Sequence, residues 1–152
     1  MAWFGGVWRR MRQKQADRSA AAAFATREVA RDTLDPSAIS YQPDIDGAPD
    51  PGEVVWTWVP FEEGDGRGKD RPVLILVRES AVLFLGMYLT SHDHDGDPDY
   101  VSVGPGAWDA QGRPSWVNTS RLFRIHERGM RREGAALSRD AFERVVSALS
   151  ER

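Results

Sequence analysis

The chain has 152 residues, of which 41% are hydrophobic and 28% charged, so it can form one globular domain and an additional segment. It has no cysteine, which excludes a disulfide framework and cysteine-based zinc sites and leads us to expect a cytoplasmic protein. A net charge of −3 excludes a globally basic nucleic-acid binder, so nucleic-acid binding would need a local basic patch. No apolar run is long enough to span a membrane.

The first 50 residues differ in character from the rest. Residues 1–18 combine apolar side chains at helical spacing with five basic residues, which predicts a short basic amphipathic helix. Our preferred interpretation is that this segment is a frayed terminus or a helix packed loosely on its own domain. The alternatives are contact with a partner protein, or with a membrane or nucleic-acid surface. Alanine-rich residues 20–32 predict another helix, and proline-rich residues 34–51 predict a linker. We therefore assign residues 1–50 to a helical extension and linker, and residues 51–152 to a folded domain.

The domain has the alternation and turn signals of short strands. We predict strands at 53–59, 72–77, 81–89 and 100–103, and one or two more within 115–125. Gly86 allows a bend or bulge, and Trp108 lies in an expected loop, where we predict that it is exposed. Ser138 is a good N-cap for a C-terminal helix with one apolar face. Locally connected strands and one terminal helix predict a mainly β fold, a small antiparallel barrel closed by that helix.

Two groups of polar residues lie at the ends of neighbouring predicted strands. Arg67, Lys69 and Arg71 lie in or just after a glycine-rich loop, where they could bind a phosphate or belong to a solvated hairpin loop. Thr90 and Ser91 end the next long strand, where their hydroxyls could donate to an anion or only terminate the strand. If the two strands form a hairpin, Arg71 and Thr90 meet at the same end of the sheet.

The segment 91–99 alternates histidine with aspartate. This pattern allows a metal site, but the glycine is misplaced for an EF-hand loop, so we predict a solvated acidic loop and no metal. His92 follows Thr90 closely enough to be considered as an acid or base. Further along, Trp116 and Arg121 flank Asn118 and could contact bases and phosphate, although a core tryptophan and a surface arginine are the preferred interpretation.

Three short runs together resemble a known family. They are Gly52-Glu53-Val54-Val55-Trp56, Arg71-Pro72-Val73-Leu74 and Leu89-Thr90-Ser91. Their order and spacing are similar to those of the PemK/MazF toxins of bacterial type II toxin–antitoxin systems, from about residue 51 to the C-terminus.

The resemblance implies an SH3-like barrel, a homodimer, a partner antitoxin, and sequence-specific, metal-independent cleavage of single-stranded RNA with no cofactor. In many such toxins the substrate's own 2′-hydroxyl attacks the phosphate and leaves a cyclic phosphate. Arg71 would then stabilise negative charge on phosphorus and could protonate the leaving oxygen, while Thr90 would hydrogen-bond a phosphate oxygen. The residues that we expect to bind substrate are Arg67, Lys69, Ser91, Asn118, Ser120 and Arg121.

The chain also departs from the family pattern. Many relatives have Gly-Ser-Glu-Gln before the Arg-Pro pair, where residues 64–67 read Gly-Asp-Gly-Arg, and Ser120 stands where an aspartate is common. If a carboxylate is the general base in this branch, either another group replaces it or hydrolysis is weak or absent. The alternatives to a nuclease are a catalytically weakened barrel that binds protein or nucleic acid, and a surface-associated regulator anchored by residues 1–18.

Overall fold

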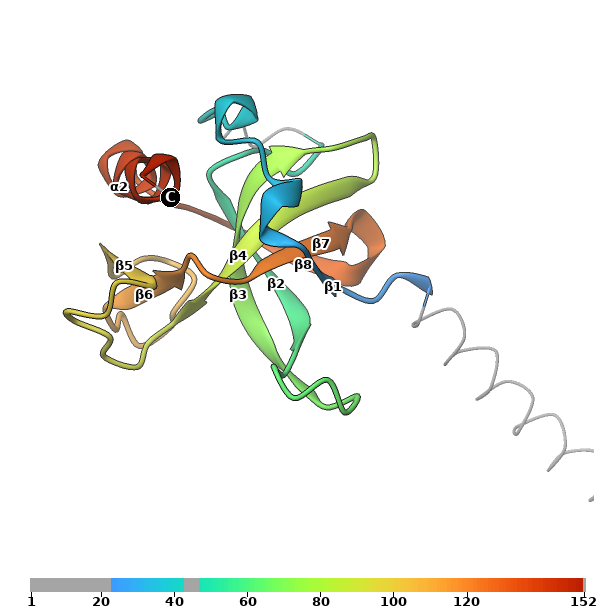
Figure 1. Cartoon of the computed structure of the whole chain (residues 1–152), viewed down its shortest axis with the longest axis horizontal. Helices are drawn as coiled ribbons and strands as arrows, with labels where there is room; N and C mark the ends of the chain where they lie inside the picture. Colours follow the sequence, from blue (N-terminus) through green and yellow to red (C-terminus); the bar gives the residue numbers. More distant parts are fainter. Residues whose placement is uncertain (1–22, 43–46, 152) are drawn as a thin grey trace, which may run out of the picture.

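The computed structural model describes residues 23–42 and 47–151, which form an antiparallel sheet with one C-terminal helix (Figure 1). The main sheet has the strand order β1-β7-β4-β3-β2-β8, and β6 pairs with both β4 and β5. The strands are β1 (Arg27–Val29), β2 (Glu53–Pro60), β3 (Gly68–Arg78), β4 (Leu83–Thr90), β5 (Tyr100–Gly104), β6 (Ser115–Asn118), β7 (Leu122–His126) and β8 (Met130–Ala136). The helix is α2 (Arg139–Ser150), and short 3-10 turns lie at Arg31–Thr33, Pro36–Ala38 and Glu127–Gly129.

The mainly β antiparallel fold with a C-terminal helix is confirmed, but closure of the sheet into a barrel is not. In the described ranges the outer strands of the main sheet are β1 and β8, and they do not pair with each other. Strand β4 bends this open sheet, because its first half pairs with β7 and its last two residues pair with β6. The sheet therefore changes direction along β4, with the β5–β6 hairpin on a separate branch.

The hydrophobic residues form two clusters on opposite faces of the sheet. One face carries Leu74, Met87 and Leu89 and is covered by α2, whose buried residues include Phe142 and Val145. Ser138 caps this helix by accepting a hydrogen bond from the Ala141 N–H at 3.2 Å, as predicted. The other face carries the cluster of Val55, Val59, Val73, Ile75, Phe84, Tyr88, Phe123 and Ile125.

The central hairpin of β3 and β4 sets the register of the functional residues. Val73 pairs with Tyr88, and the register shifts by one residue opposite Gly86, which confirms a bulge at this point. A Cβ on Gly86 would lie 2.5 Å from the Leu74 carbonyl oxygen, so no larger residue fits the close strand packing here.

The described part of the N-terminal segment packs on the sheet, and the helix predicted over 20–32 is wrong there. Residues 27–29 form β1 against β7, and the Thr26 and Thr57 hydroxyls are 2.6 Å apart and buried. Leu34 is buried in the core, and the Tyr41 hydroxyl donates to the Leu137 carbonyl at 2.8 Å. A polar sequence with one apolar residue, Arg27-Glu-Val29, forms a strand because an edge strand gains its stability from ladder hydrogen bonds and one inward side chain. The helix predicted over residues 1–18 lies outside the described residues, and the domain boundary at residue 51 remains a prediction.

All the strands that the sequence predicted occur in the structure. Two further strands, β1 and β8, were not predicted from the sequence. In β8 only Ala135 is buried, so its sequence lacks the apolar alternation that identifies a strand. Among the described helices, none is long and apolar enough to cross a membrane.

Candidate functional site

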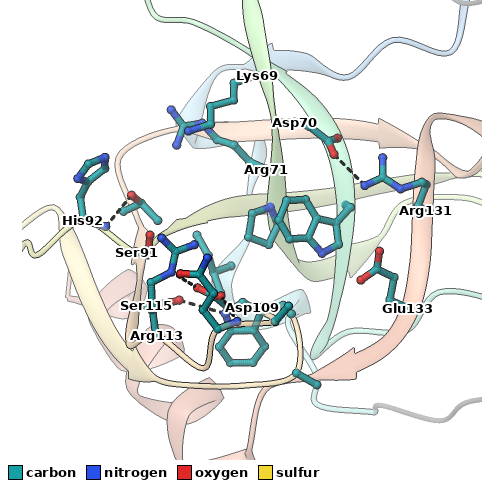
Figure 2. A pocket seen from close by; sticks show the side chains of 18 residues that line it. Lys69, Asp70, Arg71, Ser91, His92, Asp109, Arg113, Ser115, Arg131 and Glu133 are labelled. Carbon is teal, nitrogen blue, oxygen red and sulfur yellow. Dashed lines mark hydrogen bonds and ion pairs between the residues drawn. The ribbon is translucent and has the colours of Figure 1, made fainter.

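A cleft of about 670 Å³ opens where β3 begins and β4 ends (Figure 2). Its lining comes from four places: the start of β3, the end of β4 with the two residues that follow it, the loop 105–114 with the first residue of β6, and β8 together with Trp56 of β2. The lining residues used below are Trp56, Lys69, Asp70, Arg71, Thr90, Ser91, His92, Trp108, Asp109, Arg113, Ser115, Arg131 and Glu133.

Arg71 enters the cleft from the start of β3. Its backbone is fixed by pairing with Thr57 of β2, whose buried hydroxyl donates to the Gly129 carbonyl at 2.8 Å. The Arg71 guanidinium lies 4.7 Å from the centre of the Tyr88 ring and makes no ion pair or hydrogen bond with any described residue. A rigid strand and an aromatic surface therefore hold a cation whose hydrogen-bond donors are still available.

Thr90 enters the same cleft from the end of β4. The register that pairs Val73 with Tyr88 places Thr90 opposite Arg71 two residues further on, and Trp116 of β6 pairs with Thr90 from the other side. The Thr90 Oγ1 accepts a hydrogen bond from the His92 backbone N–H at 3.2 Å. Because that bond uses only a lone pair, the hydroxyl proton remains free to be donated to an anion.

The charges in the cleft are segregated. Asp70 accepts from Arg131 at 2.8 Å, which raises the pKa of Arg131, and Glu133 adds to that rise. Asp109 accepts from Arg113 at 2.8 Å. Figure 2 shows Arg131 and Glu133 at one end of the cleft, with Lys69, Arg71 and His92 at the other. The end that contains Arg71 is consequently cationic and fits an anion such as a phosphodiester.

Other predicted substrate-binding residues form a second group beside this cleft. The Asn118 amide Nδ2 donates to the Tyr88 hydroxyl at 2.8 Å and to the Tyr100 hydroxyl at 3.2 Å, and the Asn118 Oδ1 accepts from the Ser120 hydroxyl at 2.7 Å. We call Tyr88, Tyr100, Asn118 and Ser120 the tyrosine cluster. Burial and the hydrogen bond with Tyr88 raise the pKa of Tyr100 to about 12. The Tyr88 ring joins this cluster to the cleft, because Arg71 covers it.

Arg121 and Arg67 are already occupied by carboxylates. Arg121 donates two hydrogen bonds to Glu28 of β1, at 3.1 and 2.9 Å, and one to the Pro60 carbonyl. The pairing with Glu28 raises the pKa of Arg121. Arg67 forms an exposed ion pair with Asp65 at 2.7 Å and, within the described chain, lies outside the cleft lining. The structure thus brings Lys69, Arg71, Thr90 and Ser91 together and leaves Arg67 outside the cleft lining. The Arg121 guanidinium lies 5.8 Å from the centre of the Tyr88 ring that Arg71 also covers, but it is paired with Glu28.

The loop 91–99 uses its carboxylates for local turns. Asp93 accepts from the Asp95 N–H and Asp97 accepts from the Asp99 N–H, while the His94 ring stacks on Tyr100 at 3.6 Å. Within residues 23–42 and 47–151, no group of three His, Cys, Asp or Glu side chains is arranged to hold a metal ion.

The loop 105–114 and β8 contribute residues that the sequence did not indicate. The prediction that Trp108 is exposed is wrong: its side chain is buried, and its Nε1 donates to the Ser115 hydroxyl at 3.0 Å. The Trp56 Nε1 is buried with no hydrogen-bond partner among the described residues. The sequence feature that could have indicated these two residues was the high tryptophan content, because a buried indole needs a hydrogen-bond partner for its N–H. The residues of β8 gave no signal, because exposed charges of an edge strand resemble a loop.

Residues 50–151 match the family model described as the PemK-like, MazF-like toxin of type II toxin-antitoxin systems. No curated protein matches the chain.

Proposed function

The chain belongs to the PemK-like, MazF-like family of type II toxins, and from that premise we propose that it is an endoribonuclease that cuts single-stranded RNA without a metal. The observation that carries this proposal is that the Arg71 guanidinium and the Thr90 hydroxyl lie at the same open, cationic end of a cleft. The guanidinium has no ion pair or hydrogen bond with the described residues. A phosphodiester is the anionic group that such a site fits, because both residues present donors to non-bridging oxygens.

The proposed reaction uses the substrate's own nucleophile. The 2′-hydroxyl attacks the adjacent phosphorus, and Arg71 and Thr90 stabilise the charge that develops on the phosphoryl oxygens. Loss of one such preorganised donor typically costs about 10²–10³-fold in rate. Lys69 and Ser91 would bind the neighbouring backbone, since both line the cleft.

The tyrosine cluster would bind the RNA next to the reacting phosphate. Its hydroxyl and amide groups are fixed by mutual hydrogen bonds, which suits recognition of a base edge more than of a flexible backbone. As in other toxins of this family, we propose a homodimer and an antitoxin that blocks the RNA site.

The test is cleavage of single-stranded RNA by the purified full chain in the presence of a chelator. We expect cuts that leave a 2′,3′-cyclic phosphate, loss of at least 100-fold in rate for Arg71→Ala and Thr90→Val, and no cut at a position that carries a single 2′-deoxynucleotide. Arg78→Ala is the matched control, because Arg78 is exposed at the other end of β3. Equal rates for wild type and both site variants would refute the assignment.

A catalytically weakened binding module is the second candidate. It is favoured by Gly64-Asp65-Gly66-Arg67, which has no glutamate where many relatives have one, and by Ser120 in place of an acid. The same variants separate the two candidates: RNA binding that depends on Arg71, without any cleavage by the wild type, identifies the module.

A further inference from the structure

We propose that His92 is the general base of this cleft, which removes the proton from the attacking 2′-hydroxyl. This inference rests on the proposed nuclease function and names the group that replaces the missing acids. It concerns a residue of this chain that lies outside the three runs on which the family resemblance depends.

The backbone of His92 is held next to Thr90. Its N–H donates to the Thr90 Oγ1 at 3.2 Å, which places residue 92 directly beside the end of β4. The imidazole is exposed at the cationic end of the cleft, and Figure 2 shows it on the same side as Lys69 and Arg71. It makes no hydrogen bond or ion pair with the described residues, so one ring nitrogen can accept a proton from a ligand.

The other proton acceptors in the cleft are engaged by arginine. Asp70 and Glu133 interact with Arg131 at the opposite end, and Asp109 accepts from Arg113. The hydrogen bonds from the Gln111 N–H and from Arg113 lower the pKa of Asp109, which makes this carboxylate a weaker base. Histidine is also the residue type that most often transfers protons near neutral pH.

The step balances without a metal or a second reagent. A His92 ring nitrogen takes the 2′-hydroxyl proton as the 2′-oxygen forms a bond to phosphorus. The bond from phosphorus to the 5′-oxygen breaks, and that oxygen keeps the electron pair and takes a proton from water. His92 then returns its proton to solvent, so the products are a 2′,3′-cyclic phosphate and a 5′-hydroxyl. The charged groups that line the cleft with His92 are Lys69 and Arg71, the Arg113–Asp109 pair, and Asp70, Arg131 and Glu133 at the other end. Asp93, the next residue in the chain, accepts from the Asp95 N–H.

The experiment compares wild type, His92→Gln and His92→Ala in the same cleavage assay over a range of pH. We expect kcat to fall about 10²–10⁴-fold in both variants. We also expect the rising acidic limb of the pH–rate profile to disappear, and free imidazole to restore part of the rate of His92→Ala. Affinity for a 2′-O-methyl RNA, which cannot react, should stay within twofold of wild type. His126→Gln is the control, since this histidine pairs with Leu83 at the far end of β4.

The outcomes are distinguishable. If the wild type cuts RNA and His92→Gln cuts within threefold of it with the same pH profile, His92 is not the base and the nuclease assignment stands. A large loss with no imidazole rescue and weaker binding of 2′-O-methyl RNA makes His92 a binding residue and overturns the inference. If the wild type does not cut RNA, both the proposed function and this inference fail.

Discussion

Replacing Arg132 with methionine should destabilise the chain more than any exposed charge substitution. Arg132 of β8 donates to both oxygens of Glu53 of β2, at 2.7 and 3.0 Å. It also donates to the Gly47 and Ala48 carbonyls at 3.1 Å each. These four bonds fasten β8, which carries two residues of the cleft lining, to the turn that precedes β2.

The magnitude follows from the burial of Glu53. This residue is only 6% exposed, and without the arginine its remaining hydrogen bond is from the Asp50 N–H at 3.1 Å. Breaking a fully buried pair costs about 3–5 kcal/mol. Because the Arg132 side chain is 26% exposed, solvent screens part of that interaction, and we expect roughly 2–3 kcal/mol. For a chain of this size, this corresponds to a Tm lowered by about 6–10 °C.

Thermal unfolding of Arg132→Met, Glu53→Met and the double variant measures this effect. The double variant should be more stable than the sum of the single effects predicts, because it leaves no unpaired buried charge. A Tm change below about 2 °C for Arg132→Met, or strictly additive single effects, would show that the pair is not buried as described.

Three further predictions concern charge. Glu28→Gln removes the negative charge paired with Arg121, so single-stranded RNA should bind more tightly at low salt and with a steeper salt dependence by filter binding, and unchanged affinity would argue against an RNA contact by Arg121. The hydrogen bonds from Arg124 lower the pKa of Glu79 in the folded state. The pair therefore stabilises the fold at pH values above the ordinary pKa of glutamate, and this stabilisation is lost as the pH falls through the lowered pKa of Glu79. A denaturation series at pH 3–7 should show this loss in wild type and not in Glu79→Gln. Tyr100, with its pKa raised to about 12, should stay protonated at pH 11 in an ultraviolet titration, and stability should fall as pH rises from 10, because the unfolded chain loses this proton first.

The sequence predicts the central strands because each of them is buried on at least one face. The apolar residues of β3 and β4 favour buried strands over other secondary structure. The juxtaposition of Arg71 and Thr90 then follows from the antiparallel pairing of these two strands. Edge strands do not give such a signal, since their side chains face solvent on one or both sides and their stability comes from backbone pairing. This is why β1 was predicted as helix and β8 was missed.

The site could be predicted at the strand ends and in the residues that directly follow them. Arg71 and Thr90 lie at strand ends, whereas Arg113 and Trp108 reach the cleft from a loop whose path depends on tertiary packing. The role of Arg121 was also beyond the sequence, because the carboxylate that holds it is chosen by the fold. Glu28 is 93 residues from Arg121 along the chain.

The attachment of β1 to β7 has a practical consequence for anyone who trims this protein to the segment that the family shares. A fragment that begins at residue 50 would lack Leu34, leaving a void in the core, and would deprive the Thr57 hydroxyl of its contact with Thr26. It would also expose the backbone groups of Leu122, Phe123 and Arg124 along a bare sheet margin. An unpaired sheet edge can pair with the edge of another chain, so we expect the shortened protein to self-associate or precipitate. A loss of activity in this fragment would then reflect poor solubility as much as impaired catalysis.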